Sequence, residues 1–340
     1  GVAVRADATA VLGGLKTGLL RFPGAEFAGD LHLVPLAIPP EAEERLPVAV
    51  LDADVARAAL PARPRSGHKW SFGAVLVVAG SEQYLGAPYL AGAGAARSGC
   101  GLVVFAATPR RQAVLAGLLP EATYAPLPDD DVAGAPDAAL ERLLPFTERA
   151  HAVLIGPGLG RSPAVTSFVV RFLEALAVRR PALPVVVDAD GLYALSEVDG
   201  WWDRVASPLV LTPHYGEMQR LTGAPREEIA RSPWDVALRA ARRWRQVVVL
   251  KGPFTVIAEP RGQGWVLPAA NPALATGGTG DVLAGLVAGL LAQSASPVAA
   301  AQAAVFVHSQ SARHLLVERR DRKSTRLHSS TCQYRMPSSA

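Results

Sequence analysis

Six short apolar runs recur along this chain, and longer stretches rich in Ala, Leu and Arg separate most of them. The runs cover residues 74–79, 102–106, 152–155, 185–187, 209–211 and 247–250. A strand that is apolar at every position has both faces buried, as in a parallel sheet that helices cover on both sides. Helical segments such as 87–97, 163–178 and 234–245 supply those covers. The alternation predicts an α/β fold of three layers, αβα, with a mostly parallel central sheet.

Two further apolar runs, 254–258 and 264–267, predict an antiparallel pair at the edge of this sheet. A turn that contains Pro260 and Gly262 joins them. Polar residues and glycines follow most of the predicted strands. Ligands of open α/β sheets bind at the carboxyl ends of the strands, so we expect the functional residues at that edge.

The first 40 residues differ from the rest of the chain. They contain short strand-like runs, glycines and prolines, and we expect no complete βαβ unit there. The stretch 39–45 is rich in Pro, Glu and Arg, which indicates a linker. We therefore place a domain boundary near residue 44, with one domain in 1–44 and a larger one in 45–318.

Composition indicates a cytoplasmic protein without a membrane segment. Half of the residues are hydrophobic, which is enough for a large core. The longest apolar runs, 282–292 and 297–307, are each shorter than the roughly 20 residues that cross a bilayer. No charged and then apolar signal segment opens the chain, which starts within a domain at Gly1.

The last 22 residues distort the net charge. Residues 319–340 contain six basic residues and one acidic residue, a charge of +5, so the total of +4 leaves −1 for the rest of the chain. A nearly neutral body provides no basic surface for nucleic acid. Residues 321–327 closely resemble an in-frame translation of a common short-read sequencing adaptor. We interpret 319–340 as a non-native, disordered tail.

A glycine-rich segment followed by a helix, residues 271–289, predicts an anion site. Gly277, Gly278 and Gly280 permit unusual backbone angles and leave amide groups exposed. These amides are expected at a helix N-terminus, where the macrodipole favours phosphate. Asp281 on the same turn is poorly placed to bind phosphate and better placed to accept a proton from a hydroxyl group that is being phosphorylated. The alternative is an ordinary N-capped helix after a glycine-rich loop.

Two other turns with glycines follow predicted strands. Gly80 ends the first strand and Gly86-Ala87 opens the next helix, so a substrate can approach the backbone there. Residues 156–160, Gly-Pro-Gly-Leu-Gly, precede a helix that Ser162 is expected to cap, and they lack the spacing of a dinucleotide fingerprint. We interpret them as a glycine-lined wall that touches the substrate. Close helix–strand packing and a plain tight turn are the alternatives.

Charged residues follow three more strands. Asp188 is a candidate for an indirect magnesium contact, and Asp190 is expected to cap the next helix. His214 can donate to a phosphate or a substrate hydroxyl group, and Glu217 can equally stabilise the first helical turn. Lys251 emerges near the glycine-rich loop if strand order follows the sequence, where it would neutralise a nucleotide phosphate. The alternatives are a structural histidine and an exposed turn lysine.

Taken in order, these segments resemble the ribokinase-like family of dehydratases that repair hydrated NADH and NADPH. The resemblance covers residues 51–308, and its specificity depends on the combination of segments. They are His68-Lys69 with Phe72-Gly73, Gly80-Ser81 with Gly86-Ala87, 156–160, 188–190, 212–217, Lys251-Gly252 and 271–281. Related kinases of hydroxymethylpyrimidines, thiazoles and sugars share the Gly-Thr-Gly-Asp helix start but not this series.

The resemblance implies a substrate and a reaction. The substrate is the S form of NADHX or NADPHX, whose nicotinamide ring carries an added water at C6. The family phosphorylates that hydroxyl group with ADP or ATP and Mg²⁺, and phosphate then leaves to restore the reduced nicotinamide. The Ala- and Arg-rich composition indicates a bacterial origin, and hence ADP as the donor. Family members often form tetramers, so a homo-oligomer is expected.

The resemblance also implies roles for individual residues. Asp281 is the base, and the amides of Gly278, Thr279 and Gly280 hold the phosphoryl group. Substrate contacts are implied for Ala87, Gly158, His214 and Asp281. Nucleotide contacts are implied for Lys251, Gly252, Pro253, Phe254, Thr255 and Gly280.

Residues 1–40 resemble the last part of the NAD(P)HX epimerase domain that precedes the dehydratase in bifunctional bacterial enzymes. The part expected to carry the catalytic and potassium-binding residues of an epimerase is not found in the sequence, so we expect no epimerase activity. Two other functions stay open. One is a small-alcohol kinase on the same fold that releases a stable phosphomonoester, and the other is a nucleotide-binding module without catalysis.

Overall fold

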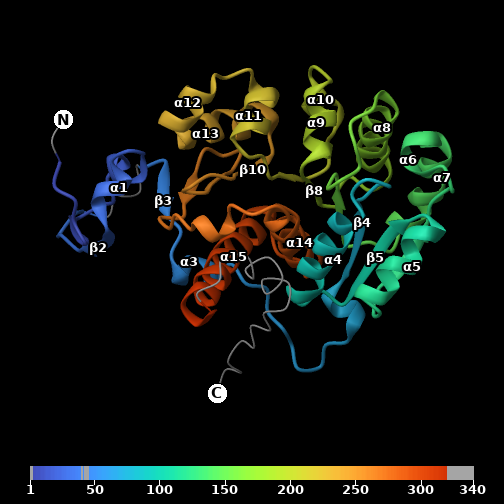
Figure 1. Ribbon diagram of the computed structural model, residues 1–340, viewed down its shortest axis with the longest axis horizontal. Coiled ribbons are helices and arrows are strands. Elements are labelled where there is room, and N and C mark those ends of the chain that lie inside the picture. Colours follow the sequence, from blue (N-terminus) through green and yellow to red (C-terminus); the bar gives the residue numbers. More distant parts are fainter. Residues whose placement is uncertain (1–2, 40, 42–45, 320–340) are drawn as a thin grey trace.

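A ten-stranded sheet with helices on both faces forms the centre of the computed structural model, which describes residues 3–39, 41 and 46–319 (Figure 1). In spatial order, its strands are β3 (Val48–Val50), β12 (Gly264–Val266), β11 (Val256–Ala258), β10 (Val247–Leu250), β9 (Leu209–Leu211), β8 (Val185–Val187), β7 (Ala152–Ile155), β4 (Ala74–Val78), β5 (Leu102–Ala107) and β6 (Thr123–Pro126). All neighbours from β6 to β10 are parallel. The predicted mostly parallel sheet is confirmed.

Side chains alternate along each strand between two cores, one on each face of the sheet. In β4, Leu76 and Val78 belong to one core, whereas Val75 and Val77 belong to the other. The first core lies under α6 (Asp131–Gly134), α7 (Pro136–Thr147), α8 (Pro163–Arg179), α9 (Asp190–Ser196), α10 (Trp201–Arg204), α11 (Tyr215–Thr222), α12 (Arg226–Arg231) and α13 (Pro233–Trp244). The second lies under α3 (Ala53–Ala58), α4 (Gly86–Arg97), α5 (Pro109–Leu118), α14 (Thr279–Ala292) and α15 (Pro297–Arg319). This is the expected αβα arrangement.

Helix α14, which begins at the glycine-rich loop, packs against α4 at very short range because glycines face the contact. A Cβ atom on Gly285 would lie 2.0 Å from the Ala91 carbonyl oxygen, and one on Gly94 would lie 2.4 Å from the Val282 carbonyl oxygen. Real Cβ atoms do not approach backbone atoms so closely, so these positions require glycine. The close contact fixes the position of the first turn of α14 over the sheet.

The antiparallel pair β11–β12 exists, but its predicted position at the sheet edge is wrong. Strand β3 pairs with β12 in parallel and is itself the edge strand. The short run that forms β3 lies just after the linker-like stretch, where no strand was expected. Strand β6 was also not predicted, because its sequence, Thr-Tyr-Ala-Pro, contains a proline and little apolar character.

The N-terminal residues form a small unit beside the β3 edge of the sheet (blue in Figure 1). Strands β1 (Ala8–Leu12) and β2 (Asp30–Val34) are parallel, and the 3₁₀ helix η1 (Thr17–Leu20) and helix α1 (Ala25–Ala28) connect them. The expectation that this region lacks a βαβ crossover is therefore wrong. The crossover escapes prediction because its helix has only four residues.

The N-terminal unit docks on the main domain through three consecutive residues. Leu20 is buried in the first core, and the Arg21 guanidinium group lies 4.8 Å from the centre of the Trp234 ring. Phe22 stacks on Phe254. The expected boundary near residue 44 and tail residues 320–340 lie outside the described residues. Across the described parts of the chain, each helix is too short or too polar to cross a bilayer.

Candidate active site

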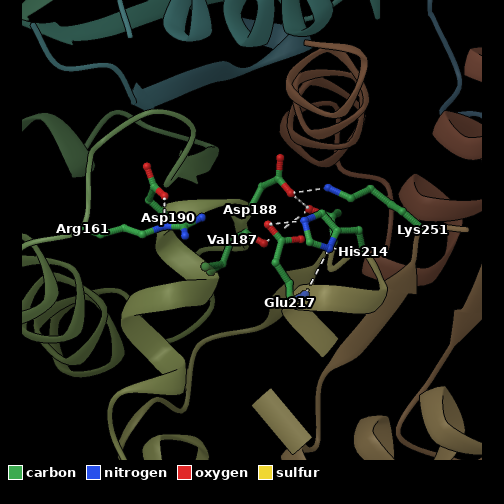
Figure 2. Close-up of polar contacts among 8 residues, drawn as sticks. Arg161, Val187, Asp188, Asp190, His214, Glu217 and Lys251 are labelled. Carbon is green, nitrogen blue, oxygen red and sulfur yellow. Dashed lines mark hydrogen bonds and ion pairs between the residues drawn. The ribbon is translucent and has the colours of Figure 1, made fainter. Parts of the chain in front are cut away.

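Three neighbouring parallel strands end at the same edge of the sheet and bring polar side chains together. Asp188 follows β8, Thr212 follows β9 and Lys251 follows β10. The Lys251 ammonium group donates to Oδ1 of Asp188 at 2.7 Å (Figure 2). The Thr212 hydroxyl donates to the same oxygen, also at 2.7 Å. The alternative interpretation of Lys251 as an exposed turn residue is therefore wrong.

The Asp188–Lys251 ion pair is largely withdrawn from water, since the two side chains are 2% and 20% exposed. Burial acts to lower the pKa of Lys251, but Asp188, Glu217 and Asp281 outweigh burial and raise the pKa. The lysine is therefore charged throughout the physiological range. It provides one fixed positive charge among several carboxylates.

Asp190 does not cap α9 as expected. Its carboxylate accepts the Arg161 Nε–H at 2.8 Å (Figure 2). It also accepts the Gly160 amide at 2.9 Å and makes no capping bond to its own helix. The preceding residue, Ala189, has a φ of +50° and a ψ of −116°, which is a strained backbone conformation for a residue with a side chain. This conformation turns the Asp190 side chain toward the 156–160 loop.

The two residues implied as substrate contacts on that side of the sheet are adjacent. A Cβ atom on Gly158 would lie 3.0 Å from the Ala87 Cβ and 2.6 Å from the Tyr84 Cβ, so the loop lies directly against the start of α4. Gly158 also has a φ of +65°, which glycine adopts without strain. Ser162 caps α8 as predicted, because its hydroxyl accepts the Val165 amide at 3.2 Å.

His214 and Glu217 form a reciprocal cap at the start of α11. The Glu217 carboxylate accepts the His214 backbone amide at 2.8 Å, and the His214 Nδ1 accepts the Glu217 amide at 3.1 Å. Burial and the nearby Lys251 charge lower the pKa of His214, whereas burial raises the pKa of Glu217 to about 6. Since Nδ1 is an acceptor, the neutral imidazole carries its proton on Nε2 and can donate it to a ligand.

The glycine-rich loop leads into α14 with the expected geometry. Gly278 has a φ of +93° and α14 begins at Thr279, whose hydroxyl donates to the carbonyl oxygens of Leu274 and Thr276. The Thr279 amide is not bare, since it donates to the Thr276 carbonyl at 3.3 Å. In the described part of the chain, the Gly278 and Gly280 amides make no such bond. They remain available to an anion at the positive end of the helix.

Asp281 lies on the first turn of α14 and faces the charged strand ends. Burial, together with the nearby Asp188 carboxylate, raises the pKa of Asp281 to about 7, although the Lys251 charge acts in the opposite direction. A Cβ atom on the neighbouring Gly280 would lie 3.3 Å from Lys251 Nζ, so the helix start and the ion pair are in contact. A carboxylate with this pKa can accept a proton near neutral pH.

A cavity of about 810 Å³ opens beside the start of α14. Gly280, Thr279, Lys251 and His214 line it. From the predicted nucleotide segment, Gly252, Pro253 and Thr255 line it as well, whereas the Phe254 side chain is buried and faces a second cavity. The size suits a nucleotide.

Three residues of this region were not predicted from the sequence. Arg161 holds Asp190, and the buried Arg111 donates to the Gly80 carbonyl at 2.6 Å and to Asp131, which fixes the turn after β4. His308 on α15 lines the cavity, and burial lowers its pKa to about 4. Each lies outside the segments that the sequence analysis singled out, and its partners are distant in sequence, so only the tertiary structure identifies it.

Several known proteins resemble this chain in sequence and in fold. A family described as NAD(P)H-hydrate dehydratase matches residues 75–332. A bifunctional NAD(P)H-hydrate repair enzyme of Salinibacter ruber is 43% identical over 90% of this chain and 57% of its own length. The chain thus spans somewhat more than half of this bifunctional relative.

Two further matches come from Bacillus subtilis. An ADP-dependent (S)-NAD(P)H-hydrate dehydratase is 38% identical over 74% of this chain and 84% of the relative. A crystal structure of an ADP/ATP-dependent NAD(P)H-hydrate dehydratase, co-crystallised with ATP and Mg²⁺, has a TM-score of 0.71 and 36% identity. It covers 83% of this chain and 95% of that one.

Proposed function

The chain belongs to the NAD(P)H-hydrate dehydratase family, and from this premise we propose that it converts (6S)-NADHX and NADPHX to NADH and NADPH. The reaction phosphorylates the C6 hydroxyl group with an adenine nucleotide, and phosphate then leaves. The observation that supports it best is Asp281, a carboxylate with a pKa of about 7 on the first turn of a helix whose Gly280 lines a nucleotide-sized cavity.

Each residue of the site has a separate role in this proposal. The open amides of the 278–280 segment bind the phosphoryl group that is transferred, and Lys251 balances its charge. Asp281 accepts the proton of the C6 hydroxyl as the oxygen attacks phosphorus. His214 donates from Nε2 to the substrate. Ala87 and Gly158 leave room for the nicotinamide ring, because neither has a side chain beyond Cβ.

We propose ADP as the donor, since the Bacillus subtilis relative carries that name. Among the described residues, no cluster of His, Cys, Asp or Glu could hold a metal ion alone. The Oδ1 atom of Asp188 is engaged, but Oδ2 lies on the side of Gly280. This fits a Mg²⁺ ion that is held mainly by phosphates and water. When bound, the ion would neutralise phosphate charge.

The deciding experiment incubates the protein with (6S)-NADHX and either ADP or ATP and follows the absorbance of reduced nicotinamide. Recovery of NADH together with free phosphate supports the proposal. A stable phosphomonoester without NADH would instead identify a small-alcohol kinase, which the family assignment does not favour. Nucleotide binding without turnover would identify a non-catalytic module. We further propose that the protein is cytoplasmic and forms a homo-oligomer. Light scattering measures its oligomeric state.

A further inference from the structure

An exposed aromatic side chain of the N-terminal unit lies on the wall of the proposed nucleotide cavity. Phe22 is 52% exposed and lines the 810 Å³ cavity that Lys251 and Gly280 also line. Its ring stacks on the ring of Phe254, with centroids 6.1 Å apart and planes inclined by 26°. Phe254 follows Lys251 by three residues, so at most about 11 Å of backbone separates them. Phe22 is therefore within the reach of a nucleotide whose phosphates lie at Lys251.

A second cavity, of about 710 Å³, adjoins the proposed nucleotide cavity and indicates which end of the nucleotide cavity faces the N-terminal unit. It lies between that unit and α15, where Leu19 and Arg313 line it from opposite sides. The residues that line both cavities are Phe22, Ala269, Ala270, Asn271, Pro272 and Ser309. Lys251 and Gly280 line only the first. The nucleotide cavity thus extends from the phosphate-binding groups toward Phe22.

The N-terminal unit holds Phe22 in this position. The neighbouring Arg21 donates to the Ser232 hydroxyl at 3.3 Å and covers the Trp234 ring, while Leu20 is buried. Phe22 itself contributes one face to Phe254 and keeps half of its surface open. Covering the exposed part of an aromatic ring with a flat, apolar group lowers the free energy of the complex.

We propose that Phe22 stacks on the base of the bound nucleotide, so that the N-terminal unit completes a nucleotide site built mostly by the main domain. The inference rests on the proposed function, which places the phosphates at Lys251 and Gly280. Leu267, Leu283 and Val305 also line the cavity and suit a base rather than a phosphate. The N-terminal unit then has a role that is independent of epimerase chemistry.

The test compares the dissociation constants of ADP and of inorganic pyrophosphate, measured by calorimetry on the full chain. Phe22→Leu keeps an apolar side chain but removes the aromatic face, and we expect it to weaken ADP binding about tenfold while pyrophosphate binding is unchanged. Phe22→Trp should retain the affinity of the parent for ADP. Phe27→Leu is the matched control, because Phe27 belongs to the same unit, contacts Arg5 and lines neither cavity.

Two results would overturn the inference. One is an unchanged affinity of Phe22→Leu for ADP. The other is an equal loss of affinity for ADP and for pyrophosphate, which would indicate that Phe22 only helps to dock the N-terminal unit on the main domain. The binding measurement does not depend on turnover. If the parent fails to produce NADH but Phe22→Leu weakens the binding of ADP and not that of pyrophosphate, the proposed function fails and this inference stands. If the parent is active and Phe22→Leu binds ADP normally, only this inference fails.

Discussion

The Lys251 ammonium group and the Asp188 carboxylate form a 2.7 Å ion pair between the ends of two strands that are not neighbours, because β9 lies between β8 and β10. Thr212 from β9 donates to the same oxygen and completes the bridge. Both charges act on the pKa of Asp281, in opposite directions. The Asp188–Lys251 pair at the edge of the sheet therefore influences the pKa of the proposed base.

Replacement of Lys251 by Met is expected to destabilise the protein by about 3 kcal/mol, because a buried carboxylate loses its partner. Urea unfolding of the parent and the variant measures the difference. Lys69→Met is the control, since Lys69 is exposed and makes no ion pair among the described residues. An equally small effect of both substitutions would show that the Asp188–Lys251 pair does not stabilise the fold.

The pH dependence of kcat/KM should show an acid limb with a midpoint near 7, since the proposed base must be deprotonated and the pKa of Asp281 is about 7. Activity is expected to rise with pH through this midpoint and then to level off. Asp188→Asn removes a negative charge that raises the pKa, so the midpoint should move to lower pH.

Glu217→Gln is the control for this pH profile, because burial raises the pKa of Glu217 to about 6 and its titration would give an acid limb close to that of Asp281. Glutamine retains an oxygen that accepts the His214 amide. The midpoint should stay near 7 in this variant. A midpoint that disappears with Glu217→Gln, or does not move with Asp188→Asn, would assign the limb to another group.

Asp281→Asn should lower kcat by about a thousandfold, as expected for loss of a general base, and should also stabilise the protein at pH 8. The folded-state pKa of about 7 exceeds the ordinary aspartate value of 3.8. Between these values the unfolded chain loses its proton first, so the stability of the parent falls as pH rises from about 4 to 7 and is constant above. The Asp281→Asn variant has no ionisable group at this position, so its stability does not fall in this way as pH rises.

Urea unfolding at pH 4 and pH 8 tests the stability effect. The two proteins should be equally stable at pH 4, and the variant should be more stable by about 4 kcal/mol at pH 8. Asp199→Asn, at an exposed position, is expected to change neither activity nor its pH dependence. Turnover of Asp281→Asn at the rate of the parent would exclude Asp281 as the base.

The sequence predicts the sheet well because its central strands are apolar at every position. Four of the six predicted strands have the expected bounds, including β8, β9 and β10, whose ends form the site. The edge strands β3 and β6 escape prediction since they are short and partly exposed. Their pairing depends on the neighbouring strand rather than on their own pattern.

Within the site, the sequence identifies residues that lie in recognisable segments, but not the contacts among them. Asp281, Lys251 and His214 follow from strand ends and the glycine-rich loop. The role of Asp190 was predicted wrongly, because a helix cap is the usual local partner of such a residue, and only the fold brings Gly160 and Arg161 to it. Phe22 is more than 200 residues away from Lys251 in sequence, so no local pattern connects them.

Asp190→Ala is expected to raise KM for NADHX several-fold and to leave KM for ADP unchanged, because it frees the 156–160 loop from its anchor to the Gly160 amide. Arg161→Met is the control, since it keeps that anchor and removes an ion pair whose arginine side chain is 47% exposed, typically a contribution of at most about 1 kcal/mol. Steady-state kinetics with each substrate varied in turn measures both constants. Equal increases for NADHX and ADP would show that Asp190 acts on the whole site rather than on the loop.

Gly285→Ala should destabilise the protein by about 2 kcal/mol or more and lower its activity, because the added Cβ meets the Ala91 carbonyl oxygen at 2.0 Å and must push α14 away from α4. Gly285 lies one turn after Asp281, so any shift of the helix moves the proposed base as well. Gly117→Ala is the matched control: Gly117 is also a helical glycine, but a Cβ there meets no atom of the described residues within 4 Å, so the change should stabilise the protein by about 0.5–1 kcal/mol. Urea unfolding and the repair assay measure the two effects. If Gly285→Ala matches Gly117→Ala in stability, the close packing of α14 on α4 is not what positions the helix start.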